Sequence, residues 1–377
     1  MAVRSWVNAF AVIILSVGQA SAESSSGSLA SSVKRLTDKF MATGAEGTPP
    51  GIPAISVAIG RDGKLLYADG FGQASENRPA TAGTIYMVGS ITKQFAAAAI
   101  LRLIEKGATL RHGSTLLKTT TPVSSLLDIA NDWTLEGGPP ITVAHLLSMT
   151  SNLPNFTRRP PHELDPWGAV PAKQLLGGMK EYRPSGYPGS FEYSNTSYFL
   201  LSEIMENVEV GGSSRDYHRI LREELFTPLG LSDTGFGGDS WEANRLANPH
   251  YRRRPRFSQP DWLKGSGDVA SSVIDIFKWN KALMEGQALS PQMRDLMLSD
   301  CARVDVWTYY GMGWFISHKD GTDRFFHSGT VSGYTSYNLI VRPSPAHWVS
   351  VSLLANSDGV EGVDSLADEL AELALKS

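Results

Sequence analysis

The sequence predicts an α/β fold in which helices flank one antiparallel sheet that is built from both ends of the chain. Strand-like apolar runs occur in residues 53–71 and again in residues 313–355, whereas residues 88–300 have mostly helical periodicity. Short connections within the two strand regions favour antiparallel neighbours. We therefore expect residues 23–87 and 301–377 to form one α/β lobe, with residues 88–300 inserted as a mostly helical lobe.

The first 22 residues have the composition of a cleavable signal peptide. Arg4 precedes a short apolar run, residues 9–17, which ends in the small residues Ala20, Ser21 and Ala22. This run is too short for a stable bilayer-spanning anchor, and no later stretch approaches about 18 consecutive apolar residues. We expect cleavage near Ala22, a periplasmic or secreted protein, and no stable membrane insertion.

The mature chain is expected to open with a helix and a β-hairpin. Apolar residues at helical spacing predict an amphipathic helix over residues 29–40. The hairpin follows as strands over residues 53–59 and 64–71, joined by a tight Asp-Gly turn at residues 61–64.

The same periodicities define the elements of the middle and the end of the chain. Helical spacing predicts helices over residues 90–106, 143–149, 196–208, 214–226, 272–285 and 291–298. Strand-like runs cover residues 313–317, 324–327, 334–342 and 348–355, and a last amphipathic helix covers residues 361–373. The polar segment Lys319-Asp320-Gly321 predicts a turn between the first two of these strands.

Composition narrows the range of ligands. The 34 Lys and Arg against 38 Asp and Glu argue against a nucleic-acid partner. The one basic run, residues 252–256, is better explained as a solvated loop than as a docking patch for anionic cell-wall polymer. The single cysteine, Cys301, excludes an intramolecular disulfide and a cysteine cluster for zinc. We expect no metal and no cofactor.

The first chemical motif is Ser90-Ile91-Thr92-Lys93, which follows a glycine and opens an alanine-rich helix. Residues three apart at a helix start share one face, so the Lys93 amine can reach the Ser90 hydroxyl. Unpaired N–H groups at such a start can hold a developing oxyanion. Ser31 and Lys34 have the same spacing but lie inside the first predicted helix. The alternative for Ser90 is a helix N-cap.

The second motif is Tyr193-Ser194-Asn195, at the start of another predicted helix. A phenol has an ordinary pKa near 10, and we expect a neighbouring Lys93 ammonium to lower it enough for Tyr193 to accept the Ser90 proton. Burial and the helix start are expected to disfavour the charge of Lys93 itself. Asn195 can donate to and accept from a substrate amide. The alternative is an N-capping asparagine that follows a packing aromatic residue.

The third motif is His327-Ser328-Gly329, at the end of a predicted strand. A glycine at this place lets a substrate backbone approach the strand edge. Taken alone, His327 is more often a structural histidine.

In their order and positions, the three motifs resemble those of the serine β-lactamase and penicillin-binding-protein superfamily. The Tyr-x-Asn form of the second motif is similar to the class C branch, which includes class C β-lactamases, D-alanyl-D-alanine carboxypeptidases, D-aminopeptidases and family VIII esterases. Further similar segments are residues 141–147, 188–189, 228–231, 265–268 and 310–314. The resemblance implies a β-lactamase/transpeptidase-like fold.

The resemblance also implies a role for each motif residue. Ser90 would be the acylated nucleophile, with Lys93 and Tyr193 as its proton-handling partners and Asn195 as a substrate contact. His327, Ser328 and Gly329 would line the substrate site, and the backbone N–H of Thr330 would complete the oxyanion hole with that of Ser90. This chain departs from the family at His327, where class C β-lactamases have lysine, and at residues 149–152, where His-Thr-Ser-Gly is frequent.

The expected reaction is acyl transfer through an ester on Ser90. D-amino-acid peptides such as cell-wall peptide, simple esters and β-lactams all remain open as substrates. The alternatives are a non-catalytic penicillin-binding sensor, a true class C-type β-lactamase and a structural cell-wall adhesin. A histidine of ordinary pKa near 6.5 is mostly neutral above about pH 7. We therefore expect slow β-lactam hydrolysis, and a KM for carboxylate substrates that rises with pH as His327 loses its proton.

Overall fold

The centre of the molecule is a nine-stranded antiparallel sheet with the order β10-β11-β12-β13-β14-β15-β1-β2-β3. We describe it from a computed structural model, which covers residues 29–42, 52–130, 133–161, 164, 171–241, 245–251 and 263–377. The predicted signal peptide and the basic run at residues 252–256 lie outside the described residues. The strands are β1 (Ala54–Arg61), β2 (Lys64–Ser75), β3 (Arg78–Pro79), β10 (Ala302–Arg303), β11 (Thr308–Tyr310), β12 (Phe315–Lys319), β13 (Thr322–Val331), β14 (Tyr334–Ser344) and β15 (His347–Ala355).

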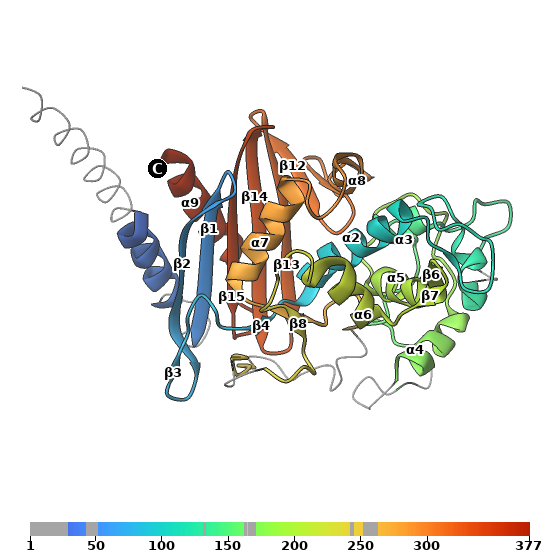
Figure 1. Cartoon of the computed structure of the whole chain (residues 1–377), viewed down its shortest axis with the longest axis horizontal. Coiled ribbons are helices and arrows are strands. Elements are labelled where there is room, and N and C mark those ends of the chain that lie inside the picture. Colours follow the sequence, from blue (N-terminus) through green and yellow to red (C-terminus); the bar gives the residue numbers. More distant parts are fainter. Residues whose placement is uncertain are drawn as a thin grey trace, which may run out of the picture.

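Both ends of the chain contribute to this sheet, as predicted. β1 pairs with β15 over seven residue pairs, from Ile55 opposite Ala355 to Arg61 opposite Val349. Figure 1 shows the blue strands of the N-terminal part beside the red strands of the C-terminal part. The fold class predicted from the sequence is therefore confirmed.

Two tight turns fix the hairpins at one end of the sheet. Asp62 and Gly63 have φ angles of 49° and 76°, and Asp320 and Gly321 have φ angles of 52° and 73°. Paired left-handed residues of this kind match the right-handed twist of the strands that they join. The prediction that residues 319–321 form a turn between two strands is confirmed.

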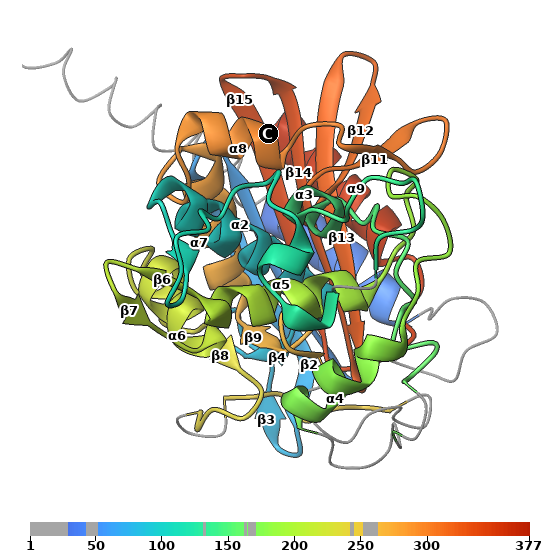
Figure 2. The same cartoon turned by 90° about the vertical axis from the view of Figure 1, so that its right-hand side faces the viewer.

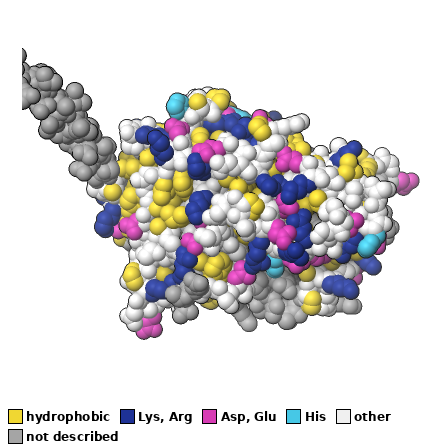
Figure 3. Space-filling model, viewed as in Figure 1, with side chains coloured by type: hydrophobic (Ala, Val, Ile, Leu, Met, Phe, Trp, Pro, Cys, Tyr) yellow, Lys and Arg dark blue, Asp and Glu magenta, His cyan; other side chains and the backbone are white. Residues whose placement is uncertain are grey.

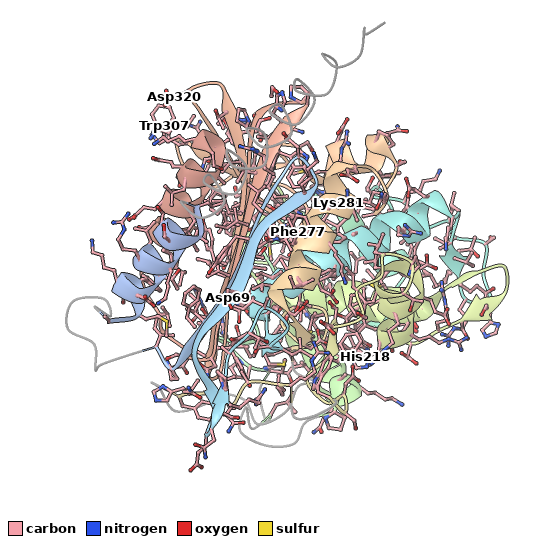
Figure 4. The ribbon with its side chains drawn as sticks, turned by 60° about the vertical axis from the view of Figure 1, so that its left-hand side comes forward. Asp69, His218, Phe277, Lys281, Trp307 and Asp320 are labelled. Carbon is pink, nitrogen blue, oxygen red and sulfur yellow. The ribbon has the colours of Figure 1, made fainter. Side chains whose placement is uncertain are left out.

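The two faces of the sheet are covered by different helices. On one face, the helix at residues 29–42 and α9 (Val363–Lys376) bury apolar side chains against β1, β14 and β15. On the other face, α7 (Val273–Met284) packs against β15 and β1. A Cβ atom on Gly60 would come within 2.2 Å of the Phe277 ring, so the absence of a side chain lets this helix lie close to the sheet. Figure 4 shows Phe277 on α7 facing the strands.

The remaining helices gather beyond α7, in front of the sheet in the view of Figure 2. They are α2 (Thr92–Glu105), α3 (Val143–Leu147), α4 (Ala172–Gly178), α5 (Asn195–Asn207), α6 (Tyr217–Leu221) and α8 (Pro291–Met297), with the short helices η1 (Gly89–Ile91), η2 (Val123–Ser125), η3 (Asp128–Ala130), η4 (Met179–Glu181) and η5 (Arg222–Phe226). The division of the chain into lobes at residues 87 and 300 stays a prediction. Within the middle segment, α7 packs on the sheet itself.

Two small sheets lie within residues 86–271, and their strand pairing was not predicted. One has the order β4-β9-β8 and the other β5-β6-β7. Their strands are β4 (Tyr86–Met87), β5 (Thr109–Leu110), β6 (Val208–Val210), β7 (Ser213–Ser214), β8 (Gly235–Phe236) and β9 (Val269–Ser271). Strands of two or three residues are too short to show a hydrophobic period. The predicted helix over residues 214–226 begins only at Tyr217 and ends as the π-helix η5.

The surface carries both signs of charge in close mixture. Figure 3 shows Lys and Arg beside Asp and Glu over much of the face that it displays. On α6 and η5, for example, Arg219 contacts Glu223 at 2.6 Å and Arg222 contacts Asp239 at 2.7 Å. No helix in the described ranges is both long and apolar enough to cross a membrane.

α2 is the central helix, and a buried amide network ties it to the sheet. Asn280 of α7 and Asn338 of β14 exchange two hydrogen bonds of 2.8 Å. Asn338 also donates to Gln94 of α2 at 3.1 Å, and Trp279 donates to the same Gln94 oxygen at 3.2 Å. Because Gln94 follows Lys93 directly, this network sets the position of α2 where the first motif lies.

We predict that Asn338→Leu lowers the melting temperature. The substitution removes the partner of Asn280 and one partner of Gln94, and a buried polar group left unpaired costs about 1–3 kcal/mol. Thermal unfolding followed by circular dichroism measures the change. Lys319→Ala, at an exposed position, should change the free energy of unfolding by no more than about 0.5 kcal/mol. An Asn338→Leu protein as stable as the natural one would show that the network is unimportant.

Candidate active site

Ser90 is the middle residue of the short helix η1, directly after a glycine that the backbone requires and two residues before α2. Gly89 has a φ angle of 51°, which a residue with a side chain rarely adopts. A Cβ atom on Gly89 would also lie 2.9 Å from the Thr330 nitrogen. The chain therefore needs glycine before Ser90 both for its backbone conformation and for the approach of β13.

Gly329 of β13 also allows this close approach between β13 and the turn that carries Ser90. A Cβ atom there would come within 2.1 Å of the Val88 oxygen and 3.0 Å of the Ser90 nitrogen. Ser336 on β14 donates to that Val88 oxygen at 2.7 Å and holds the turn against the sheet. The two glycines thus bring the backbone of Ser90 and Thr330 together. Their predicted use as an oxyanion hole stays a prediction.

Lys93 is fully buried, and its amine has three hydrogen-bond partners. Its Nζ lies 3.0 Å from Ser90 Oγ, 2.8 Å from Asn195 Oδ1 and 2.6 Å from the Ser266 backbone oxygen. Burial holds the pKa of Lys93 well below its ordinary value, while the carboxylate of Asp268 acts in the opposite direction. The prediction that burial disfavours the charge of Lys93 is confirmed in the direction of this shift.

The three partners determine how a neutral Lys93 amine is oriented. A neutral amine has two N–H groups and one lone pair. Asn195 Oδ1 and the Ser266 carbonyl oxygen only accept hydrogen bonds, so they take the two N–H groups. The lone pair is then left for Ser90, whose hydroxyl can donate as well as accept. The lone pair of a neutral Lys93 amine is therefore directed to the Ser90 hydroxyl, from which it can accept the proton.

The orientation of the Asn195 amide is fixed by its own neighbours. Its Nδ2 donates to Thr157 Oγ1 at 3.0 Å, and that hydroxyl donates to Asn155 Oδ1 at 2.9 Å. Asn155 Oδ1 also accepts from the backbone N–H of Asn195 at 3.3 Å. Asn195 therefore presents its oxygen to Lys93. Its predicted contact with a substrate amide stays a prediction.

Tyr193 contacts Ser90 and packs against aromatic side chains of the large sheet, among them Tyr310 and His327. Its hydroxyl donates to Ser90 Oγ at 2.8 Å, and its ring stacks on Phe315 at 6.4 Å with an interplanar angle of 4°. Burial raises the pKa of Tyr193, and the hydrogen bond with Ser90 offsets this only in part. We had expected the Lys93 charge to lower this pKa. That expectation is wrong, because burial of the phenol is the largest effect and it disfavours the phenolate.

His327 is placed differently from what the sequence suggested. Its side chain is 1% exposed, its Nε2 lies 3.2 Å from the Tyr310 hydroxyl, and its Nδ1 lies 2.6 Å from the Ser328 oxygen. Burial and the neighbouring Lys93 lower the pKa of His327 to about 3. We had expected the KM for carboxylate substrates to rise with pH as His327 lost its proton. That expectation is wrong, because a side chain with this pKa is already neutral at about pH 6 to 8. This residue packs beside the site as an uncharged ring.

Ser328 and Thr330 are exposed, and with Gly329 they lie on an open stretch of β13. β12 pairs with residues 322–326 of β13 and no further. Residues 327–331 are paired with β14 on one side only, among the strands that the structure describes. The structure thus brings the third motif beside Ser90 as a strand edge.

Several residues of the site were missed by the sequence reasoning. Ser266 contributes a backbone oxygen, which no residue type signals, although the segment 265–268 was noted as similar to the family. Thr157 and Asn155 come from a loop without a recognisable pattern. Asn152, where the family often has glycine, has a φ angle of 56°, a conformation that asparagine tolerates.

The second serine-lysine pair is placed on the outer side of the first helix. Lys34 contacts Asp38 at 2.5 Å, and both side chains are more than half exposed. Ser31 is exposed as well. This position favours Ser90 over Ser31 as the site of chemistry.

We predict an acid limb in the pH profile of kcat/KM for an uncharged short-chain ester. Activity requires the neutral amine, so it falls as the pH falls through the lowered pKa of Lys93. The raised pKa of Tyr193 predicts no alkaline loss up to about pH 10. The measurement is kcat/KM of the natural protein at each pH, with the rate of Ser90→Ala under the same conditions subtracted. A loss of activity on raising the pH from about 7 to 9 would contradict the assignment.

We predict that Tyr193→Phe lowers kcat by about 10²–10⁴, the usual span for a general acid–base group. The phenylalanine ring keeps the stacking on Phe315 and loses only the hydroxyl beside Ser90. Tyr182→Phe is a matched control, because the Tyr182 hydroxyl donates to the Arg159 oxygen at 2.7 Å, in another part of the fold. Equal activities of the two variants would remove Tyr193 from the mechanism.

Curated relatives of this chain have penicillin-binding-protein and other names. PbpX of Bacillus subtilis (strain 168), which has a penicillin-binding-protein name, is 26% identical over 296 residues, covering 74% of this chain and 65% of the relative. Protein flp of Staphylococcus aureus (strain NCTC 8325 / PS 47) is 24% identical over 339 residues, covering 85% of this chain and 62% of the relative. The chain thus spans slightly less than two thirds of the length of these curated relatives.

Solved structures share the fold. A penicillin-binding protein homologue from Pyrococcus abyssi superimposes with a TM-score of 0.72 at 26% identity, covering 93% of this chain and 77% of that one. D-amino acid amidase from Ochrobactrum anthropi SV3 superimposes with a TM-score of 0.73 at 21% identity, covering 93% of this chain and 99% of that one. The family model described as Beta-lactamase matches residues 33–376. This chain therefore belongs to the Beta-lactamase family, a hydrolase family of the serine β-lactamase and penicillin-binding-protein superfamily.

Proposed function

We propose that this protein is a serine hydrolase that forms an acyl-enzyme on Ser90 and acts on esters and D-amino-acid peptides or amides. The observation that carries the proposal is the pair of hydrogen bonds on the Ser90 hydroxyl, 3.0 Å from Lys93 Nζ and 2.8 Å from the Tyr193 hydroxyl. One partner is a buried neutral base and the other a neutral acid. This is the combination that acyl transfer through a serine requires.

In the first half of the reaction, Ser90 Oγ attacks the substrate carbonyl and its proton passes to the Lys93 amine. The backbone N–H groups of Ser90 and Thr330 hold the oxyanion. The bond to the leaving group then breaks, and Tyr193 gives its proton to that group. The products of this half are the Ser90 ester, the free leaving group, a Lys93 ammonium and a Tyr193 phenolate.

In the second half, water attacks the ester and loses a proton to the Tyr193 phenolate. The Ser90 oxygen leaves the acyl carbon and takes back a proton from the Lys93 ammonium. The acid product departs, and both side chains return to their neutral forms. The ion pair exists only between the two halves, where Lys93 and Tyr193 lie close enough for each charge to stabilise the other; Lys93 Nζ is 5.0 Å from the Tyr193 ring centroid.

The open edge of β13 supports a peptide-like substrate. Residues 327–331 have one side of the strand unpaired by β12, and a substrate amide can add to such an edge through backbone hydrogen bonds. The neutral, buried His327 supplies no positive charge for a substrate carboxylate. This favours esters and amides over carboxylate-bearing β-lactams.

The names of structural neighbours point the same way. One is described as a D-amino acid amidase, and another, EstCE1, as a hydrolase with promiscuous acyltransferase activity. In a periplasmic or secreted protein, as the leader at residues 1–22 suggests, cell-wall peptide would be an available substrate.

We predict that Ser90→Ala lowers ester and peptide turnover by several orders of magnitude while the protein stays folded. Intact-mass analysis after incubation with a penicillin, a D-Ala-D-Ala peptide and a short-chain ester shows which compound acylates the protein. A mass increase is expected on the peptide that contains Ser90. Ser31→Ala is the matched control and should label and turn over as the natural protein does.

The outcomes separate the alternatives. Labelling at another serine, or unchanged turnover in Ser90→Ala, would contradict the proposal. A long-lived adduct without steady turnover would indicate a sensor instead. Efficient β-lactam hydrolysis would indicate a class C-type β-lactamase.

A further inference from the structure

A buried carboxylate lies behind the catalytic lysine. Asp268, directly before β9, is 2% exposed, and the sequence gave no role to it. Its Oδ1 accepts from the Tyr217 hydroxyl at 3.1 Å and from the backbone N–H of Gly265 at 3.2 Å. Its Oδ2 lies 3.4 Å from His218 Nε2. Burial of a carboxylate is costly, so its retention at this place calls for an explanation.

The hydrogen bond to Gly265 closes the turn that carries Ser266. Gly265 has a φ angle of 71°, and a Cβ atom on it would lie 2.5 Å from the Tyr198 oxygen, so the turn is packed tightly against α5. The backbone N–H of Ser266 is bound to the Leu263 oxygen at 2.8 Å. With its N–H held in this way, Ser266 directs its carbonyl oxygen to Lys93 at 2.6 Å.

Asp268 also acts on Lys93 through its charge. The titratable groups that face Lys93 are Tyr193, Tyr198 and His327, and burial keeps all three in their neutral forms at neutral pH. Asp268 is the group whose charge raises the pKa of Lys93 against the effect of burial. Burial raises the pKa of Asp268 itself, and its hydrogen bonds with His218 and Tyr217 act against that rise. The carboxylate favoured by these bonds limits how weak a base the buried amine becomes.

His218 connects this carboxylate to the solvent. Its side chain is 44% exposed, and Figure 4 shows it on the outer side of the helical region. The centroid of the His218 ring lies 3.9 Å from that of the Phe236 ring. The Arg222 guanidinium also lies over the Phe236 ring, 4.8 Å from its centroid. Arg222 is paired with Asp239. The groups that contact the Asp268 carboxylate are His218 and Tyr217 from α6 and the backbone N–H of Gly265.

We propose that Asp268 is a positioning residue for the reaction on Ser90, which holds the Ser266 carbonyl against Lys93 and keeps a negative charge behind the amine, with His218 as its solvent-facing partner. The inference rests on the proposed function, because it assigns a purpose to a group that acts through the proposed base. Asp268 itself does not contact the Ser90 hydroxyl.

The test is Asp268→Asn, whose side-chain oxygen can still accept from Gly265 and Tyr217. The turn is kept and the charge is lost, so the pKa of Lys93 falls further. The acid limb of kcat/KM on an uncharged ester should move to lower pH by roughly one unit, the size expected for a nearby charge at an effective dielectric constant of about 20. Asp275→Asn is the matched control, since Asp275 is also a fully buried aspartate but is paired with Lys278 on α7. It should reduce the melting temperature without moving the limb.

A turnover-independent measurement separates this inference from the proposed function. Nuclear magnetic resonance of protein labelled with 13C at lysine Cε follows the Lys93 titration, with the signal assigned from its absence in Lys93→Met. The Lys93 titration should shift to lower pH in Asp268→Asn, whether or not an ester is hydrolysed. If Asp268→Asn does not fold, Tyr217→Phe weakens the stabilisation of the carboxylate and should shift the titration in the same direction. An unchanged titration, or a shift to higher pH, would overturn the inference.

Discussion

The buried amine of Lys93 is the feature on which the rest of the site depends. Three acceptors surround it, but only the Ser90 hydroxyl can also donate. Burial disfavours the charge of the amine, and in its neutral form the two carbonyl oxygens leave its lone pair for the serine. The same burial keeps Tyr193 protonated. The resting site therefore holds a base and an acid on one hydroxyl, both neutral, and charge develops only after the substrate has reacted.

The fold explains how a lysine is kept in such a place. α2 is buried along most of its length, and four consecutive alanines, residues 96–99, let neighbouring elements pack closely against it. A network of side-chain amides holds α2 in its position against β14, through Gln94, Asn280 and Asn338. Gly89 and Gly329 let β13 approach the start of this helix. Asn195 at the start of α5 and Ser266, in the turn held by Asp268, complete the surroundings of the Lys93 amine.

Much of this architecture was predictable from the sequence, because periodicity and turn chemistry are local. The long strands, the two Asp-Gly turns and the order of the motifs follow from patterns of neighbouring residues. The motifs also identified Ser90, Lys93 and Tyr193, which the structure brings together. The short strands β3 and β5 to β11 were missed, since two or three residues carry no period.

The electrostatic state of the site was less predictable, because it depends on burial in the folded chain. The pKa of Tyr193 was expected to fall and instead rises. His327 was expected to titrate near neutral pH. It is instead buried beside Tyr310, and its pKa is lowered to about 3. The partner of Lys93 at Ser266 is a backbone oxygen, and Asp268 has no motif that separates it from a surface aspartate. Such roles emerge only when distant segments are packed together.

The central claim is that Lys93 is neutral in the resting protein and directs its lone pair to Ser90. Neutron diffraction from deuterium-exchanged crystals at neutral pH shows this most directly, because it locates the exchangeable hydrogens. The account predicts two deuterons on Lys93 Nζ, directed to Asn195 Oδ1 and the Ser266 oxygen, with the Ser90 deuteron directed to Nζ and one deuteron on the Tyr193 oxygen. Three deuterons on Nζ and none on Tyr193 would contradict it.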